Sequence, residues 1–224
     1  MRRLLTPEHR GLTLMETLIV IILIGVLAAM GAPHVFATLS GNRVRQGVGI
    51  VRTALQDAQL QAIRLGKKCT VELGQESGST SNYFDRLRAT PVGCFVAGET
   101  TTETTTVGGT TTTYQVLRLP RGVKVSVSSN GSGTIPSFRF SFKGHIIDYS
   151  SLAVSGQIPT FVVFAVDEST DSPFTSDSYP KKCLMVASML GMIRGGNYRN
   201  ATTANALASA QVSSTNCDAL IEGR

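Results

Sequence analysis

The sequence predicts an α+β protein in which one long N-terminal helix precedes an antiparallel, β-rich head. The first observation is a stretch from Leu12 to Ala32 that is apolar except for Glu16 and two threonines. The second is a helical spacing of apolar residues that continues beyond Pro33. The third is a series of short β-branched and aromatic runs that follows residue 66.

The apolar stretch is long enough to span a membrane as a helix. At a rise of about 1.5 Å per residue it covers about 30 Å, the thickness of the hydrocarbon core of a bilayer. The leader before it carries Arg2, Arg3 and Arg10 against a single Glu8. By the positive-inside rule we expect a transmembrane segment at 12–33, a cytoplasmic N-terminus and a translocated remainder.

The helix is expected to continue from Pro33 to about residue 65. Gly66 offers a left-handed C-cap, and Lys67 and Lys68 complement the negative end of the helix. We therefore predict a helix over about 12–65 whose C-terminal half, 34–65, packs on the head. Apolar residues spaced three and four apart form its buried stripe, namely Val44, Val48, Val51, Leu55, Ala58, Ala62 and Leu65.

The segment 66–200 is predicted to be β-rich. Phe161–Val166 is apolar throughout, which favours a strand buried on both faces, whereas 129–133 has the composition of a turn. The threonine-rich segment Glu99–Thr113 is expected to be a mobile loop or an extended edge, and 201–224 a tail that only Cys217 can hold. The predicted strands are Cys69–Leu73, Tyr114–Leu119, Val123–Val127, Phe138–Phe142, His145–Tyr149, Phe161–Val166 and Cys183–Ser188.

Four cysteines in a translocated head predict two disulfides. Of the three pairings that four cysteines allow, we expect Cys69–Cys94 and Cys183–Cys217, and the sequence leaves the other two open. The formal charge of +6 falls to +4 once a leader of residues 1–11 is removed, because three arginines and one glutamate are lost. So mild a bias does not by itself indicate a nucleic-acid partner.

Glu16 is the unusual residue of the apolar stretch, because a carboxylate in a membrane segment costs about 2–3 kcal/mol unless it finds a partner. It could lie at the level of the lipid headgroups, or it could pair with an N-terminal amine freed by cleavage after Gly11. A different interpretation is a secretory signal peptide cleaved near Gly31. The helical pattern that continues beyond Pro33 argues against that interpretation.

Gly11-Leu-Thr-Leu-Met-Glu16 resembles the class III signal of type IV pilins and pseudopilins. This resemblance implies that a prepilin peptidase cuts between Gly11 and Leu12 and methylates the new amine, and that Glu16 guides assembly. Gly25 and Pro33 fall where the family has a helix-loosening glycine and a kinking proline. Leu12 departs from the usual phenylalanine or methionine.

Three further segments are similar to the GspH/FimT group of minor pilins and pseudopilins. They are Leu55–Leu73, which ends a helix and begins a strand, Phe138–Gly144, and Cys183–Gly191, which resembles the penultimate strand of that group. The resemblance implies a type IV pilin-like fold over most of residues 12–196. The whole chain then divides into a cleaved leader (1–11), the membrane half-helix (12–33) and a periplasmic head (34–224).

Sequence motifs for catalysis are absent, so we expect neither an enzyme nor a cofactor. The sequence has no G-x-S-x-G, no H-E-x-x-H and no P-loop. Gly47-Val-Gly49 lacks the strand and third glycine of a dinucleotide fingerprint. An acidic loop with Asp167, Glu168, Asp171 and Asp177 could hold Ca²⁺, but it lacks the spacing of a calcium loop, and we expect no metal site.

A basic cluster leaves DNA open as a partner. Lys181, Lys182, Arg194 and Arg199 flank a predicted strand, and a few positive side chains suffice for phosphate contacts. FimT-like pilins of naturally competent bacteria bind DNA through a C-terminal Gly-Arg-x-Arg motif, which the region 191–199 lacks.

The resemblance therefore implies a structural subunit that primes or caps a filament. It implies a bacterial inner-membrane protein with a cytoplasmic N-terminus and a periplasmic head, which then enters a type IV pilus or a type II secretion pseudopilus. Its partners would be the prepilin peptidase, other pilins through the N-terminal helix, and the membrane before assembly. The alternative function is a DNA-binding minor pilin for natural transformation.

Overall fold

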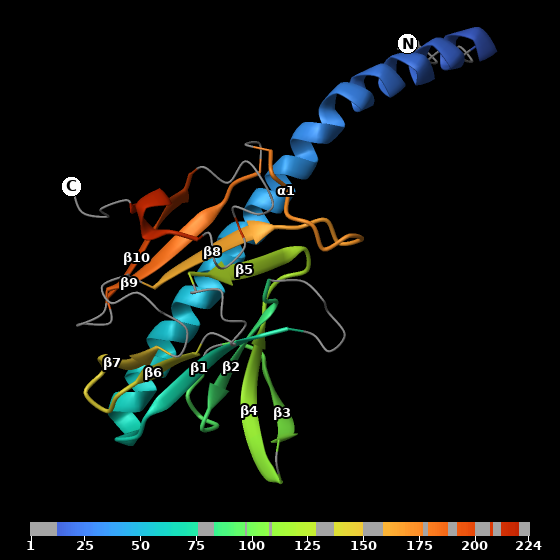
Figure 1. The fold of residues 1–224 in the computed structure, drawn as a ribbon. Coiled ribbons are helices and arrows are strands. Elements are labelled where there is room, and N and C mark those ends of the chain that lie inside the picture. The colour runs from blue at the N-terminus through green and yellow to red at the C-terminus, as the bar shows by residue number, and fades with distance from the viewer. Residues whose placement is uncertain are drawn as a thin grey trace, which may run out of the picture. The chain divides into compact units, whose positions relative to one another are not determined.

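The computed structural model shows an α+β fold with one long α-helix and two antiparallel sheets (Figure 1). It describes residues 13–75, 83–96, 98–107, 109–128, 137–149, 159–176, 179–187, 192–199, 207 and 212–219; the side chains of 30–34, 107, 148, 149, 187 and 219 lie outside this description. The chain divides into two compact units, Met1–Leu39 and Ser40–Arg224. We call the second unit the head. The sequence prediction placed the corresponding boundary after Pro33.

Helix α1 runs from Leu14 to Leu65. In the head, its apolar stripe is buried in the core, with Val44, Val51, Leu55, Ala58 and Ala62 all inaccessible to solvent. The predicted stripe is therefore correct over these residues and over the half-buried Val48.

The prediction that the buried stripe extends to Leu65 is wrong, because this side chain is 46% exposed. It lies in the last turn, where α1 has passed the strands that would cover it. The cap is as predicted: Gly66 has a φ of 61°. The backbone N–H of Gly66 donates to the carbonyl of Ile63 at 3.3 Å, and that of Lys67 donates to the carbonyl of Ala62 at 3.2 Å. These two bonds form a Schellman motif, which ends the helix.

The first sheet has six strands in the order β3-β4-β2-β1-β6-β7, and every neighbouring pair is antiparallel. Side chains alternate between its faces, so Val71, Leu87 and Phe138 point into the core shared with α1. The strands are β1 (Cys69–Gly74), β2 (Arg86–Thr90), β3 (Thr100–Val107), β4 (Thr110–Arg118), β6 (Ser137–Phe140) and β7 (Ile146–Tyr149).

The second sheet has five strands in the order β11-β10-β9-β8-β5, also antiparallel. A single bridge between Phe84 and Val125 joins its β5 edge to the segment just before β2. The strands are β5 (Val123–Val127), β8 (Thr160–Ala165), β9 (Lys182–Ala187), β10 (Met192–Tyr198) and β11 (Cys217–Ala219).

The second half of α1 lies against both sheets and buries one face of each (Figure 1). Gly47 allows the helix to approach the second sheet closely. A Cβ at this position would lie 2.9 Å from Cγ1 of Val123 and 3.2 Å from Cγ1 of Val163. The glycine pair at 47 and 49 thus belongs to a helix, and its first member has a packing role.

A second apolar core covers the other face of the five-stranded sheet. Val162 and Phe164 of β8 contribute to it, and Leu207 and Val212 from the C-terminal part of the chain close it. β8 is therefore buried on both faces, as predicted. Every described residue of both cores lies after residue 40, so the two described cores belong to the head.

Two disulfides join Cys69 to Cys94 and Cys183 to Cys217, which are the two expected pairings. The second disulfide links β9 to β11 and so holds the C-terminal segment against the sheet. The expectation that only Cys217 holds this tail is incomplete. Leu207 and Val212 are buried as well, and the N–H of Ser213 donates to the hydroxyl of Tyr198 at 3.3 Å.

Several local predictions need correction. The threonine-rich segment Glu99–Thr113 is not a mobile loop: most of it forms the hairpin β3–β4, and β3 is the extended edge of its sheet. The strand β9 is not the penultimate one, since β10 and β11 follow it. The predicted turn at 129–133 lies outside the described residues. The strands β2, β10 and β11 were not predicted, and β3 was expected only as the alternative of an extended edge.

Candidate functional sites

Helix α1 begins with a capping arrangement around Glu16. The backbone N–H of Glu16 donates to Thr13, at 3.1 Å to its carbonyl and 3.3 Å to its hydroxyl. Thr13 and Glu16 thus have the spacing of a capping box, and a carboxylate in the first turn favours the positive end of the helix dipole. Glu16 therefore also suits the start of the helix, apart from any partner in the membrane. Gly11 and Leu12, the expected processing residues, lie outside the described residues.

The described apolar side chains of the N-terminal unit are exposed along its length. The large ones between Leu14 and Leu39 are 47% to 82% accessible to solvent. A Cβ at Gly25 would meet no atom within 4 Å, so packing inside this chain does not require that glycine. Pro33 lies within the helical backbone of α1, and its side chain is outside the description.

The expected membrane segment 12–33 begins one residue before the described ones, and at its other end the side chains of 30–33 lie outside the description. Within the portion that the structure describes, no helix meets the combined requirements of length and apolar character for crossing a membrane.

The four basic residues considered for DNA binding do not form one exposed cluster. Lys181 is only 7% exposed, and its Nζ donates to the carbonyls of Thr175 and Ser176, each at 3.2 Å. Lys182 is a partner of Asn197 in the β9–β10 ladder, and its Nζ donates to the Oδ1 of that residue. Both lysines therefore make contacts inside the head.

The two arginines of the predicted cluster differ from each other. Arg199 forms an ion pair with Asp218, across the β10–β11 end of the second sheet. Arg194 lies exposed in the middle of β10, opposite Met185 of β9. Arg194 and Arg199 are therefore both exposed, but Arg199 already pairs with a carboxylate.

The acidic loop after β8 directs its carboxylates to protein groups. Glu168 contacts Arg43 of α1 at 3.0 Å, and Asp171 contacts Lys124 of β5 at 3.2 Å. The Oδ1 of Asp167 accepts hydrogen bonds from the hydroxyl and the backbone N–H of Ser169, which lower the pKa of this carboxyl. Asp177 lies outside the described residues, and the described ones contain no cluster of metal-ligating side chains.

A partly buried ionic network on the first sheet was missed by sequence reasoning. Glu103 of β3 accepts from Arg86 at 2.8 Å and from Arg88 at 3.0 Å, and it lies 3.9 Å from Arg118. Arg86 is 4% exposed and also contacts Asp85 at 3.1 Å. Alternating charges in Arg-Leu-Arg could have indicated a strand with one charged face.

Glu72 lies beside this network, opposite Arg88 in the β1–β2 ladder. Burial raises the pKa of its carboxyl, and the positive charge of Arg88 offsets part of that rise. Gly74 makes room for the arginines, because a Cβ there would lie 2.9 Å from both Cγ of Arg86 and Nε of Arg88. The network therefore has paired charges held within the sheet.

A polar cleft of about 630 Å³ adjoins this network, between the turn that leads into β5 and the acidic loop. Its walls carry both signs of charge: Arg118 and Arg121 face the cleft together with Glu168 and the Lys124–Asp171 ion pair. Since acidic and basic side chains both line it, the cleft offers no single dominant charge to a ligand.

Comparison of the whole chain with family models, with curated proteins and with solved structures finds no match.

Proposed function

We propose that this protein is a minor pilin or pseudopilin, a structural subunit that primes or caps a helical filament. The observation that carries the proposal is the division of one helix into two parts. From Leu14 to Leu39 the large apolar side chains of α1 are exposed, whereas from Val44 to Ala62 its apolar stripe is buried in the head. The segment Gly11–Glu16, which resembles a class III signal, overlaps the start of this helix.

The exposed part of α1 has no apolar partner among the described residues of its own unit. Such a surface requires lipid or other helices of the same kind, since an exposed apolar helix is unfavourable in water. The chain would wait in the inner membrane and then pack its N-terminal helix against other pilins, within a type IV pilin-like architecture. The pilus and the secretion pseudopilus both use such a subunit.

The proposal is tested first by the processing of the N-terminus. Mass spectrometry of the mature protein should find Leu12 as the first residue, methylated, and Gly11→Ala should leave the leader in place. A mature protein that begins at Gly31 or Ala32 would identify a conventional signal peptide and overturn the proposal.

A second test separates the two roles of Glu16. Glu16→Ala should insert into the membrane at least as well as wild type, because a charge is removed, but enter filaments poorly. Glu16→Gln keeps the capping box and loses only the charge, so it is the matched control. Sheared filament fractions that contain as much Glu16→Gln as wild type would refute an ionic role in assembly and attribute any effect of the alanine variant to the cap.

The DNA-binding alternative is less well supported. Lys181 and Arg199 are used inside the head, so fewer positive side chains remain for phosphates than the sequence suggested. If DNA uptake is nevertheless the function, Arg194→Ala combined with Arg199→Ala should abolish transformation while filament assembly stays normal.

A further inference from the structure

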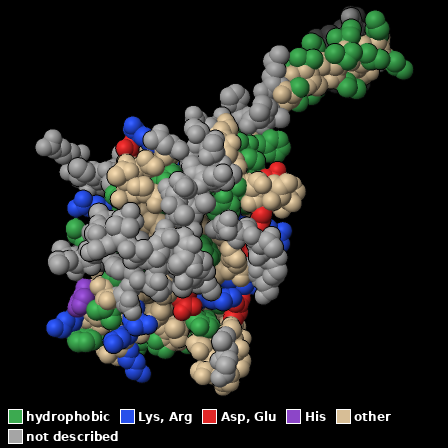
Figure 2. Space-filling view, viewed as in Figure 1, with side chains coloured by type: hydrophobic (Ala, Val, Ile, Leu, Met, Phe, Trp, Pro, Cys, Tyr) green, Lys and Arg blue, Asp and Glu red, His purple; other side chains and the backbone are tan. Residues whose placement is uncertain are grey.

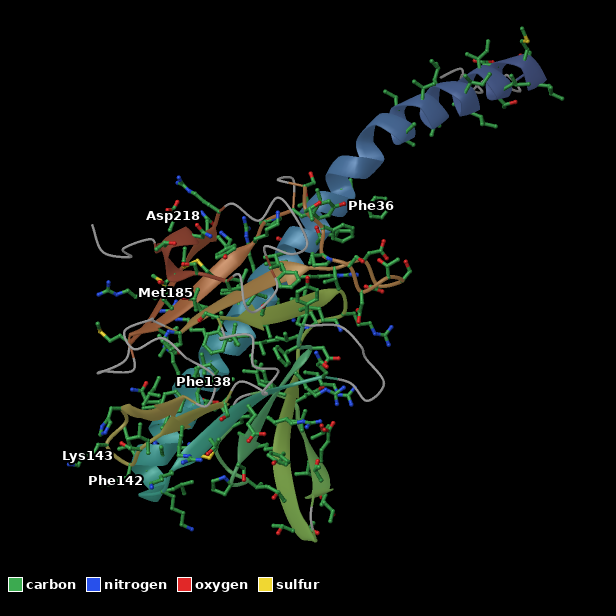
Figure 3. The ribbon with its side chains drawn as sticks, viewed as in Figure 1. Phe36, Phe138, Phe142, Lys143, Met185 and Asp218 are labelled. Atoms are coloured by element: carbon green, nitrogen blue, oxygen red, sulfur yellow. A yellow bond between two sulfur atoms is a disulfide. The ribbon has the colours of Figure 1, made fainter. Side chains whose placement is uncertain are left out.

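Two turns of the head meet at the C-terminal end of α1 and present exposed basic and apolar side chains. The first is the helix cap with residues 63–68, and the second is the β6–β7 turn with residues 141–145. Figure 3 shows Phe142 and Lys143 at the tip of the second turn, next to the end of α1. We call the exposed side chains of these two turns the turn surface, namely Ile63, Arg64, Leu65, Lys67, Lys68, Phe142 and Lys143.

Direct contacts hold the two turns together. The Nε2 of Gln59 in α1 donates to the carbonyl of Gly144 at 2.7 Å. A Cβ at Gly144 would lie 2.8 Å from Cδ1 of Ile63, so the second turn rests on the helix. In the sheet, Cys69 of β1 pairs with Phe140 of β6, which brings the residues just before β1 next to those just after β6.

Each turn is also rigid by itself. The Schellman motif fixes the first turn at Gly66. In the second turn, the carbonyl of Ser141 accepts from the N–H of Gly144 at 2.8 Å, and its hydroxyl accepts from the N–H of Lys143 at 3.0 Å. Gly144 adopts a φ of 80°. Phe142 and Lys143 are the two central residues of this turn and project outward, with the Lys143 ammonium 5.9 Å from the ring centroid of Phe142.

The chemistry of the turn surface is cationic and apolar at once. Arg64, Lys67, Lys68 and Lys143 supply four positive charges, and the two turns contain neither aspartate nor glutamate. Between them, Ile63, Leu65 and Phe142 are 49%, 46% and 53% exposed. Figure 2 shows Lys and Arg side chains beside hydrophobic ones at this end of the head.

We propose that the turn surface binds an anionic lipid membrane. Basic side chains approach the phosphates of anionic headgroups, while neighbouring apolar side chains enter the boundary between headgroups and acyl chains. The aliphatic Ile63 and Leu65 favour lipid over nucleic acid, because bases stack on aromatic rings and gain little from branched alkyl groups. The head would thereby contact a membrane through the end of α1 that lies farthest along the helix from Leu14. This inference does not depend on the proposed function.

The test uses the head, residues 40–224, which contains both described cores and both disulfides. Its partition onto vesicles of phosphatidylcholine mixed with phosphatidylglycerol is measured by cosedimentation, with pure phosphatidylcholine vesicles as reference. Binding should require the anionic lipid and weaken as salt screens the charges. In Lys67→Ala with Lys68→Ala, the partition coefficient should fall about 25-fold, since each lysine near such a surface contributes about fivefold.

Two further variants separate this proposal from general electrostatics. Arg45→Ala with Arg194→Ala removes the same net charge elsewhere on the head, at exposed sites, and should change the partition coefficient less than twofold. Phe142→Ser keeps every charge and should lower the coefficient by about tenfold, because an apolar side chain no longer enters the lipid. Circular dichroism verifies that each variant is folded.

Several outcomes would overturn the proposal. Equal losses in the two double-charge variants would show that only the net charge matters. No effect of Phe142→Ser would remove the apolar contribution. Duplex DNA that binds more tightly than the vesicles, with the same loss in Lys67→Ala and Lys68→Ala, would assign the surface to nucleic acid.

Discussion

The two sheets of the head differ in how they complete the face that points away from α1. The first sheet carries a charged network on that face, where Glu103 joins Arg86, Arg88 and Arg118. The second sheet carries an apolar core there, which includes Phe164 of β8 and Leu207 of the C-terminal segment. The comparison teaches that one helix can cover only one side of each sheet. The other side is completed either by paired charges or by a segment distant in the sequence that packs against it.

The energetic consequences of the two solutions differ. Apolar burial on the second sheet gains free energy in proportion to area, whereas the charged network gains little beyond what its desolvation costs. Removing one member of such a network is nevertheless costly, because it leaves a buried charge without its partner. Substitutions on the second sheet therefore measure the free energy of apolar burial, whereas those on the first sheet measure the cost of leaving a charge without its partner.

The largest expected effect is on the apolar side of the comparison. Phe164→Ala should lower the free energy of unfolding by about 3–5 kcal/mol, since it removes a fully buried aromatic ring. Phe161→Ala, on the opposite face of the same strand, is the matched control and should cost a similar amount. Urea denaturation of the head measures both. If Phe164→Ala cost less than about 1 kcal/mol while Phe161→Ala cost the full amount, the second core would not be a true core.

A smaller effect is expected on the charged side. Glu103→Gln should destabilise the head by about 1–3 kcal/mol, because Arg86 and Arg118 are direct partners in the β2–β4 ladder and lose the carboxylate between them. Glu168→Gln breaks the exposed pair with Arg43 and should change stability by less than about 1 kcal/mol. Equal effects of the two substitutions in urea denaturation would mean that the partly buried network contributes no more than a surface ion pair.

The smallest effect is a pH dependence from Glu72. Its pKa is raised in the folded state above the ordinary value of 4.5, so the folded protein binds the proton more tightly than the unfolded chain. The contribution of Glu72 to stability is therefore complete below pH 4.5 and is lost as the pH rises through the folded pKa. The free energy of unfolding, measured across this range, should decline less steeply in Glu72→Gln than in wild type. A parallel decline in both proteins would contradict this assignment.

The elements that the sequence predicted are those in which apolar pattern and burial agree. The helix stripe from Val44 to Ala62 and the strand around Phe161–Val166 have unambiguous periodicity, and the structure buries both. The strands that were not predicted have other compositions. β2 alternates arginines with Leu87 and Ala89, β3 is mostly threonine, and β10 contains Gly195 and Gly196, so none has the apolar, β-branched composition on which the other predictions rested.

In the candidate sites, the sequence likewise could not predict the environment of the charged residues. Charge in a sequence does not reveal burial, and Lys181 is buried because two backbone carbonyls receive its ammonium protons. The pairing of Arg199 with Asp218 depends on β11, a short strand whose position is set by the disulfide at Cys217. Such tertiary partners leave no local signal, whereas the spacing of Thr13 and Glu16 does.

The closure of the second core by Leu207, Val212 and Cys217 has a consequence for the order of folding. Translation delivers the N-terminal residues first, so β5, β8 and β9 are available before Leu207, Val212 and Cys217 have emerged. Until then, Val162 and Phe164 are exposed to solvent and form an apolar surface on which other chains can aggregate. Completion of the head is therefore a late event, and chains interrupted before residue 207 would retain an exposed apolar surface that chaperones and proteases can recognise.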